Sequence, residues 1–503
     1  MLQFSFTAKS LSPARTPRQP NVCLTRIIIR AFLTSICNQL FDAGFLEIQI
    51  NLWYASNMNA RVLAQLTLVH VGVSITVVPV TSTLNRVMIA DMQMPVTLVA
   101  VLVALPYLLS PLQIFLGNWS DRHPAADYHR TPWILLGGLL AATGSYFTVH
   151  VAYLLDHNFL MGLGAAAVVF CLWGAGINAA SVSYLSLVTE LADENGRSRA
   201  VSIMWTVMIL STILTTYGLS RMLAAPPSVS GGSTIDAISK EMLVTAFGVI
   251  WLVSVIFVLI GSYRIEPRAS ARTDQPANSA DDPMLVLRLL ALNPQARRFF
   301  LYLMIVLISI HAQDVVLEPF GAKALGMSVA ATTRLTSIWG IGIFITLLAG
   351  ILFVKRFGKK TGANVGAFVT AVAFAFIIAT GLFGNSNLFL GAVFLLGLGG
   401  GLMTVSNLSF MLDMTLPQAA GLYIGAWSVA NFAGQAIGNV ISGLLYDMFF
   451  WLTGNPLMGY SAVFSLEIAG LLLAVWLFRS ISVEEFRRQA EVRLHTVLSM
   501  ASD

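Results

Sequence analysis

Apolar segments of about 20 residues recur along this chain of 503 residues, and short polar stretches separate them. A helix of roughly 20 apolar residues crosses the hydrocarbon core of a membrane, so each segment predicts one spanning helix. After the first 60 residues, the pattern predicts twelve spans, at about 64–84, 95–116, 132–154, 160–186, 200–222, 242–263, 298–318, 330–353, 363–383, 387–410, 420–445 and 459–479.

The longest interruption, 264–297, is rich in Pro, Ala, Ser and charged residues, and it divides the spans into two sets of six. We interpret it as a cytoplasmic linker between a half at 61–263 and a half at 298–480, with a tail at 481–503. Its last part, MLVLRLLALN, is amphipathic and is expected to lie on the membrane surface. Two parallel six-helix repeats predict an all-α membrane protein with the major facilitator superfamily fold and a central cavity.

The composition favours a bilayer over an aqueous environment. Hydrophobic residues make up 56% of the chain, charged residues 11%, and the mean hydropathy is +0.77, whereas soluble domains carry about 25% charged residues. The net charge of +5 does not indicate nucleic-acid binding, because cytoplasmic loops of membrane proteins collect Lys and Arg. With both termini cytoplasmic, the outer side keeps only five of the 29 basic residues: Arg86, Arg221, Lys240, Lys323 and Arg334.

The first 60 residues differ from the rest of the chain. Up to Phe41 they include basic residues and no acidic ones, and RIIIRAFLTSICNQLF has the apolar spacing of a helix. A basic interfacial helix, a transit-like segment and translated sequence upstream of a true start at Met58 all fit this pattern. Residues 1–60 therefore stay outside the fold prediction, as an extension.

A charged loop, GNWSDRHPAADYHRTP, joins the second and third predicted spans. It has a glycine that lets helices approach, an Asp-Arg pair, and a distal arginine before a helix-starting proline: Gly117, Asp121, Arg122, Arg130 and Pro132. A carboxylate here can accept from a neighbouring helix N-terminus and from an arginine. We expect an inside gate with Asp121 and Arg130 as its contacts, which rocking of the halves would break; a solvated loop is the alternative. The equivalent loop at 350–360 lacks the Asp.

Two carboxylates lie near the outer end of the seventh span, in HAQDVVLEPFGAKALG. Asp314 and Glu318 are four residues apart and share a helix face, and His311 lies on much the same side. Ionisable groups at this depth are costly and should face a cavity or a partner. A polar cluster that lines or gates the pathway is one interpretation, and an early helix end with Glu318 in a wet turn is the other.

Arg86, at the end of the first span, is the ionisable residue of the first half that corresponds in position to the carboxylates of the seventh span. It can pair with Asp91, with Glu318 or with lipid headgroups.

Two histidines, His70 and His150, lie in otherwise apolar spans. A neutral imidazole can ligate a metal, including the magnesium of a chlorin, but a lone histidine in a membrane more often bonds a neighbouring helix.

No catalytic constellation is found in the sequence. There is no nucleophile–base pair, Walker motif or metal-ligand cluster, and the three cysteines lack a paired spacing. The glycines at 397–401 lack the strand context of a nucleotide loop and indicate close helix packing. We therefore expect neither an enzyme nor an ATP-driven pump.

Four segments together resemble one branch of the major facilitator superfamily, the PucC/LhaA or bacteriochlorophyll delivery family. They are TLNRVMI (83–89), the loop G-x-x-SDRH…RTP (117–132), QDVVLEPFGAKALGMSVAATT (313–333) and GLYIGAW (421–427). The resemblance runs from about Arg61 to about Arg479, and the LEP-F/Y-G segment is the part specific to this branch. The site residues it implies, by position, are Asn85, Arg86, Asp121, Arg130, Pro132, Asp314, Glu318, Pro319, Gly321 and Gly425, with Trp427 in the same final motif.

The resemblance implies a membrane factor for assembly of light-harvesting complexes in a phototrophic bacterium. Such a factor would sit in the cytoplasmic or photosynthetic membrane, carry (bacterio)chlorophyll as cargo, and contact lipid, antenna polypeptides and pigment-synthesis enzymes. Two other hypotheses remain open at this point. One is a proton-coupled transporter of a small solute, with Asp314 and Glu318 as proton carriers. The other is a ligand-free assembly chaperone.

Overall fold

The computed structural model describes residues 59–122, 128–192, 194–224, 240–266, 293–415 and 420–489. The N-terminal extension with Met58, the middle of the charged loop, most of the linker with its amphipathic piece and the end of the tail lie outside these residues. The elements of the first half are α3 (Ala60–Ser74), η1 (Val80–Leu84), η2 (Val87–Asp91), α4 (Val96–Leu108), α5 (Leu112–Arg122), α6 (Thr131–His157), α7 (Phe159–Leu191), α8 (Glu194–Met222) and α9 (Lys240–Ser262).

The elements of the second half are also helical. They are α11 (Pro294–His311), α12 (Gln313–Leu325), α13 (Val329–Phe357), α14 (Lys359–Phe383), α15 (Ser386–Asp413), α16 (Ala420–Thr453) and α17 (Pro456–Phe478).

Ten candidate membrane spans are present in the described part of the chain, with α11 and α12 forming one of them. The first two predicted spans are interrupted and do not count among the ten. The first changes from the α-helix α3 to the π-helices η1 and η2, and the second is broken near Pro111, where a proline cannot continue the hydrogen-bond ladder. The fold is that of a multi-pass helical membrane protein, and the number twelve stays a prediction.

Close packing within each half depends on glycine. In the first half, a Cβ on Gly137 of α6 would lie 2.5 Å from the nitrogen of Ala180 in α7. In the second half, a Cβ on Gly397 of α15 would lie 2.2 Å from the carbonyl oxygen of Trp339 in α13. The prediction that the glycines at 397–401 serve helix packing is confirmed for Gly397, Gly399 and Gly401, whereas a Cβ on Gly400 would meet no atom within 4 Å.

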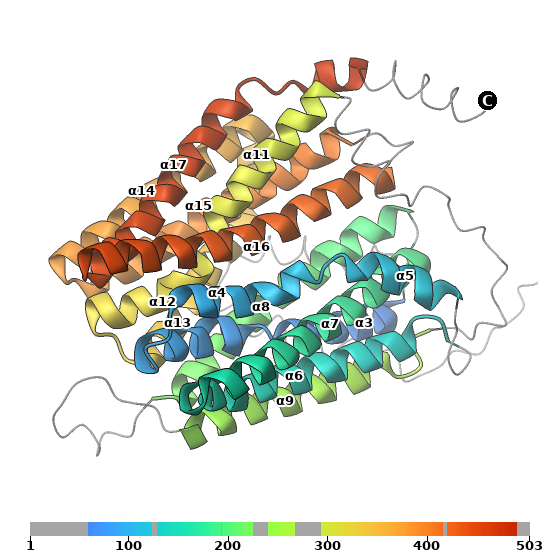
Figure 1. Ribbon diagram of the computed structural model, residues 1–503. Coiled ribbons are helices and arrows are strands. Elements are labelled where there is room, and N and C mark those ends of the chain that lie inside the picture. Colours follow the sequence, from blue (N-terminus) through green and yellow to red (C-terminus); the bar gives the residue numbers. More distant parts are fainter. Residues whose placement is uncertain are drawn as a thin grey trace, which may run out of the picture.

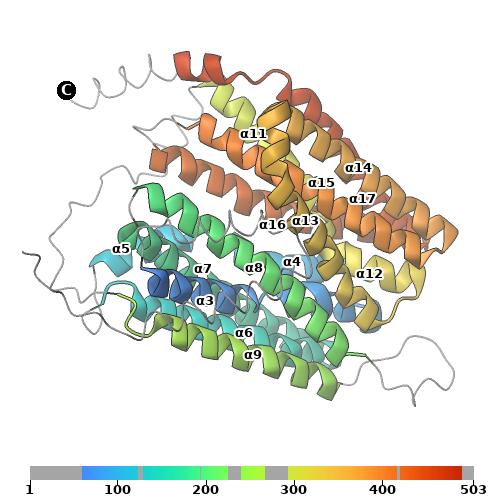
Figure 2. The ribbon, with the colours of Figure 1, turned by 180° about the vertical axis from the view of Figure 1, so that it is seen from behind.

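The two halves form separate groups of helices in the ribbon, one coloured blue to green and one yellow to red (Figure 1). The most extensive contacts between the halves are those of α4 with α16 and of α8 with α13, and α12 also contacts α4, η1 and η2. Both views place the closest approach of the halves at the end of the molecule that holds α12, which we call the α12 end (Figure 2). The opposite end, with α5 and the start of α11, is called the α5 end.

Candidate functional site

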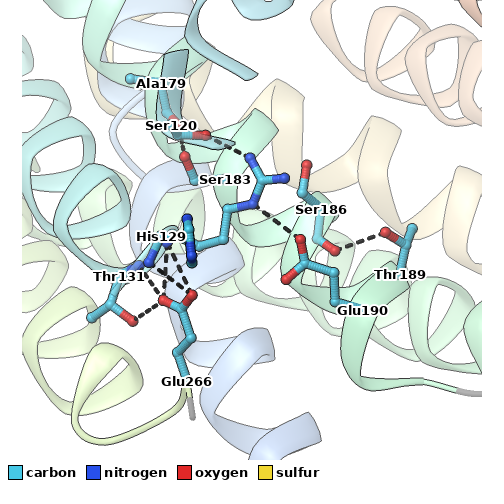
Figure 3. A network of polar contacts seen from close by, with 10 residues as sticks. Ser120, His129, Thr131, Ala179, Ser183, Ser186, Thr189, Glu190 and Glu266 are labelled. Atoms are coloured by element: carbon cyan, nitrogen blue, oxygen red, sulfur yellow. Dashed lines mark hydrogen bonds and ion pairs between the residues drawn. The ribbon is translucent and has the colours of Figure 1, made fainter. Parts of the chain in front are cut away.

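Arg130 ties three helices of the first half together at the α5 end. Its Nη1 donates to Ser120 Oγ of α5 at 2.5 Å, and its Nε lies 3.2 Å from Glu190 Oε1 of α7. Arg130 itself immediately precedes α6 and is buried. The arginine therefore holds the ends of α5, α6 and α7 in one arrangement, with Ser120 and Glu190 as partners in the same network (Figure 3).

Glu266, just after α9, caps the start of α6. Its carboxylate accepts backbone N–H bonds from His129, Arg130 and Thr131 at 2.8–3.2 Å, and Oε2 accepts from Thr131 Oγ1 at 2.9 Å. Figure 3 shows these bonds converging on Glu266. A carboxylate satisfies the unpaired donors of a helix N-terminus and interacts favourably with its dipole.

Contacts of the kind predicted for this loop are present, and two carboxylates outside the loop take part in them. Glu266 accepts from the helix N-terminus and Glu190 from the arginine, and the same contacts for Asp121 stay a prediction. Asp121 and Arg122 end α5, and their side chains, like the surroundings of Gly117, are outside what the structure describes. Pro132 lies in the first turn of α6, as predicted for a helix start. The contacts named here all lie within the first half, and gating by Asp121 remains a prediction.

Replacing Glu266 by alanine should destabilise the first half. The change leaves three buried backbone donors and one hydroxyl without their acceptor, at a cost of about 1–3 kcal/mol. We expect the melting temperature of the detergent-solubilised protein to fall by several degrees. The exposed Glu484→Ala is the matched control and should change little; equal falls in both variants would contradict the capping role.

Asn85 links the two halves at the α12 end. Its Nδ2 donates to the carbonyl of Val315 at 2.9 Å and to that of Asp314 at 3.3 Å, both in α12. The carbonyl of Val315 has no intrahelical donor, because the residue four positions later is Pro319, which has no N–H. Asn85 of the first half thus donates the hydrogen bond to the Val315 carbonyl that Pro319 of the second half cannot donate.

Arg86 is fully buried and pairs with Asp91 through Nη1. The two residues are five positions apart, and the π-helix η2 brings such positions onto one face because its turn is wider than that of an α-helix. Of the three partners considered for Arg86, the structure selects Asp91. Its burial excludes headgroup contact in this arrangement.

The carboxylates of α12 lie in different surroundings. Asp314 Oδ2 is 2.8 Å from His311 Nδ1, and both side chains are about one quarter exposed. Glu318 is buried and accepts a 3.1 Å bond from Thr336 Oγ1 of α13. The wet-turn interpretation of Glu318 is wrong, because α12 continues through Pro319 to Leu325 and buries this carboxyl.

Gly321 explains why α12 can approach its neighbours so closely. A Cβ there would lie 3.2 Å from each of Met327, Thr332 and Phe389. The glycine implied by the family resemblance is therefore a packing position between α12, α13 and α15.

Further contacts close the α12 end and were not expected from the sequence. Asp447 of α16 accepts from the backbone N–H groups of Val96 at 3.1 Å and Thr97 at 2.8 Å, and so caps α4. The predicted eleventh span ended at 445, which placed Asp447 in a loop, whereas α16 runs to Thr453. Two pairs of hydroxyl groups also join the halves: Thr83 with Thr333 at 2.9 Å, and Thr216 with Ser337 at 2.5 Å.

We call this set of contacts between the halves the α12 seam. Its residues are Asn85, Asp447, Thr83, Thr333, Thr216 and Ser337.

Trp427 and Gly425 lie near the α5 end of α16. Trp427 is buried, its Nε1 donates to Thr415 Oγ1 at 3.3 Å, and its ring packs edge-on against Phe299. This residue, a predicted cavity residue, packs inside the second half in this arrangement. The side chain environment at Gly425 is outside the described residues.

The two histidines have different environments. His70 is buried and its Nδ1 lies 2.8 Å from Tyr184 Oη, the helix-bonding role that an isolated histidine in a membrane usually has. His150 is half-buried, and its Nδ1 has no hydrogen-bond partner among the described residues. Its ring centroid lies 5.0 Å from that of Tyr146 and 5.6 Å from that of Phe147.

A pocket of about 470 Å³ lies between α6 and α9, and His150 stands behind two of its lining residues, Tyr146 and Phe147, without lining it. Its lining residues are Thr143, Tyr146, Phe147, Gly248, Trp251 and Leu252. Phe147, Trp251 and Leu252 are exposed, and α6 and α9 lie on the side of the first half away from the second half (Figures 1 and 2). The pocket therefore opens toward lipid and not toward the seam between the halves. The sequence predicted a central cavity and did not predict this pocket.

A family model for PUCC proteins matches residues 83–486. This chain belongs to the PUCC protein family. The match of this PUCC family member begins at the TLNRVMI segment and extends beyond α17.

Named relatives agree with this assignment. Protein PucC of Cereibacter sphaeroides is 27% identical over 429 residues, which cover 82% of this PUCC family member and 90% of that protein. The bacteriochlorophyll synthase 44.5 kDa chain of Rhodobacter capsulatus is 26% identical over 394 residues, covering 76% and 87% of the two chains.

Solved structures share the fold. The nucleoside transporter NupG superposes with a TM-score of 0.61 at 15% identity, covering 84% of this chain and 98% of that one. The D-xylose-proton symporter gives 0.57 at 16% identity, with coverage of 84% and 97%. The predicted major facilitator superfamily fold is confirmed.

Proposed function

We propose that this PUCC family member binds chlorophyll-type pigment within the membrane and delivers it to antenna polypeptides during assembly of light-harvesting complexes. It would act in the cytoplasmic or photosynthetic membrane of a phototrophic bacterium and perform no chemical step itself. Enzymes of pigment synthesis would supply the cargo. Membership of the PUCC family supports this role, as does the similarity to a chain that is named for bacteriochlorophyll synthesis.

The observation that carries the proposal is the lipid-facing pocket beside His150. Tyr146, Phe147 and Trp251 provide aromatic faces and edges for a flat macrocycle, at a site that a hydrophobic molecule enters directly from the bilayer. The imidazole of His150 is the ligand type that a chlorin magnesium accepts. Trp251 Nε1 lies 3.4 Å from Thr143 Oγ1, which holds the indole at the rim.

Replacing His150 by leucine should remove most of the bound pigment. Leucine keeps the apolar volume but has no metal ligand, so pigment retained per protein should fall about tenfold or more, equivalent to about 1.4 kcal/mol or more. The measurement is the ratio of pigment to protein absorption after purification from pigment-replete cells of a phototroph.

A matched control is His157→Leu, at the exposed end of the same helix, which should keep its pigment. Pigment-free wild-type protein from pigment-replete cells would refute the binding role. Equal retention in His150→Leu and wild type would refute the assigned pocket. In a strain that lacks the gene, the membranes should lose antenna absorption bands, and His150→Leu should restore them only weakly.

A further inference from the structure

Three buried polar side chains from three helices of the second half have polar atoms without partners. They are Gln313 of α12, Asn439 of α16 and Glu467 of α17, which are 5%, 0% and 1% exposed. Among the described residues, no hydrogen-bond partner exists for Gln313 Oε1, for either amide atom of Asn439, or for either carboxyl oxygen of Glu467. Buried polar atoms are nearly always paired, so five unpaired atoms in three side chains need a physical explanation.

Contacts along α17 place Glu467 level with the junction of α11 and α12. Helix α17 runs antiparallel to α11 and α12, since its Phe478 stacks on Tyr302 of α11 and its Tyr460 packs on Phe320 of α12. Between these contacts, a Cβ on Gly470 would lie 2.1 Å from Ser309 Oγ. One turn further along α17 is Glu467, which this register sets opposite Gln313.

Contacts along α16 place Asn439 at the same level. A Cβ on Gly438 would lie 2.8 Å from the carbonyl oxygen of Ile308 and 3.2 Å from the nitrogen of Ala312. Asn439 follows Gly438, and Gln313 follows Ala312. Gln313, Asn439 and Glu467 therefore lie at one level of the second half, that of the junction at Ala312, where α11 ends and α12 begins.

In the part of the chain that the structure describes, no cation forms an ion pair with Glu467. Its helix packs against α11, α12, α14 and α16. The titratable residues that these helices carry, among side chains the structure describes, are Arg297, Arg298, Tyr302, His311, Asp314, Glu318, Lys323, Lys359, Lys360, Tyr446 and Asp447. Asp314 is the group that acts on Glu467 electrostatically, with the same sign of charge, and His311 is paired with Asp314. An isolated buried carboxylate is very costly, so a neutral carboxyl is the stable form here.

We propose that Glu467, Asn439 and Gln313 form an internal proton-binding site of the second half, with Glu467 carrying the proton. The protonated carboxyl donates one hydrogen bond and accepts others, and the amides of Asn439 and Gln313 can do both. The site adjoins the junction that positions α12, and α12 bears the Val315 carbonyl bound by Asn85. Loss of the proton would draw water into the junction and weaken the α12 seam. This proposal does not depend on pigment binding.

Infrared difference spectroscopy of the purified full-length protein tests the protonation state. In the wild type minus Glu467→Gln spectrum at neutral pH, we expect the carbonyl band of a protonated acid, which shifts in heavy water. The control difference with the exposed Glu484→Gln should show only ionised carboxylate bands. Carboxylate bands for Glu467, with or without sensitivity to sodium, would overturn the proposal in favour of a cation site or an ionised group.

A second variant keeps the test decisive if Glu467→Gln fails to fold. Asn439→Leu retains the carboxyl and removes one hydrogen-bond partner at similar side-chain volume. The protonated-acid band of Glu467 should then move toward the frequency of a free acid, so that wild type minus Asn439→Leu shows a paired positive and negative signal. A flat difference in the acid carbonyl region would show that Asn439 and a protonated Glu467 do not interact, and would overturn the site.

Discussion

Replacing Gly443 by valine is expected to open the α12 end of the molecule. A Cβ at this position of α16 would lie 2.7 Å from the Cα of Thr97 and 2.8 Å from the Cβ of Ala100, both in α4. The obstacle is backbone, which cannot rotate away as a side-chain tip can. Helix axes lie about 8–10 Å apart according to the side chains between them, so valine should push α4 and α16 apart by about 1–2 Å.

The displacement would also break the cap that Asp447 provides. Its carboxylate lies 2.8 Å from the nitrogen of Thr97, and a shift of about 1–2 Å exceeds the tolerance of a hydrogen bond. We therefore expect Gly443→Val to shift the protein away from the closed α12 seam and to abolish function in a strain that depends on it.

Spin labels on α4 and α16 measure this separation. The exposed positions Val101 and Leu444 are suitable, in a protein whose three native cysteines are replaced. Gly400→Val is the matched control, because a Cβ on Gly400 would meet no atom within 4 Å. An unchanged distance distribution in Gly443→Val would show that this contact does not hold the end closed.

Replacing Asn85 by leucine should have the second largest effect. The change leaves the Val315 carbonyl buried without a donor, because Pro319 cannot supply one. An unpaired buried carbonyl costs about 1–3 kcal/mol, so the melting temperature should fall by several degrees.

The partner substitution Pro319→Ala turns this prediction into a double-mutant cycle. An alanine at 319 has an N–H that can bond the Val315 carbonyl within α12, which makes Asn85 dispensable for that carbonyl. Asn85→Leu should therefore cost less in the Pro319→Ala background than in wild type, with a coupling of about 1 kcal/mol. Additive losses would mean that Asn85 acts elsewhere.

Asn85 and Pro319 were both predicted as site residues from the sequence, but the relation between them was not. Both residues lie in segments that resemble the PucC/LhaA family, and both were candidates on that ground. Nothing in either segment indicated that one compensates for the other, since they are far apart along the chain and belong to different halves. The sequence shows that Pro319 has no N–H to donate, but it does not show which distant group donates in its place.

Asp447 and Glu467 are two residues that the sequence analysis did not select as candidates. An isolated carboxylate in an apolar span is by itself a signal of function. Asp447 was not selected because the predicted span ended at 445, two residues before it, whereas α16 continues to Thr453. Glu467 was not selected because the sequence around it contains no charged partner. Glu266 and Glu190 were likewise not predicted, because both are far along the chain from the N-terminus of α6 or from Arg130, which they contact.

The sequence by itself determined the membrane class, most of the spans, the division into two halves and the family. These properties follow from hydrophobic length and from short motifs, which are local and survive any arrangement of the helices. Only the tertiary structure decided which groups meet: Asn85 with Val315, Asp447 with the start of α4, and Arg130 with Ser120 and Glu190. The physical reason is that a buried polar atom in a membrane must find its partner on another helix, and helix neighbours are set by packing of the whole bundle.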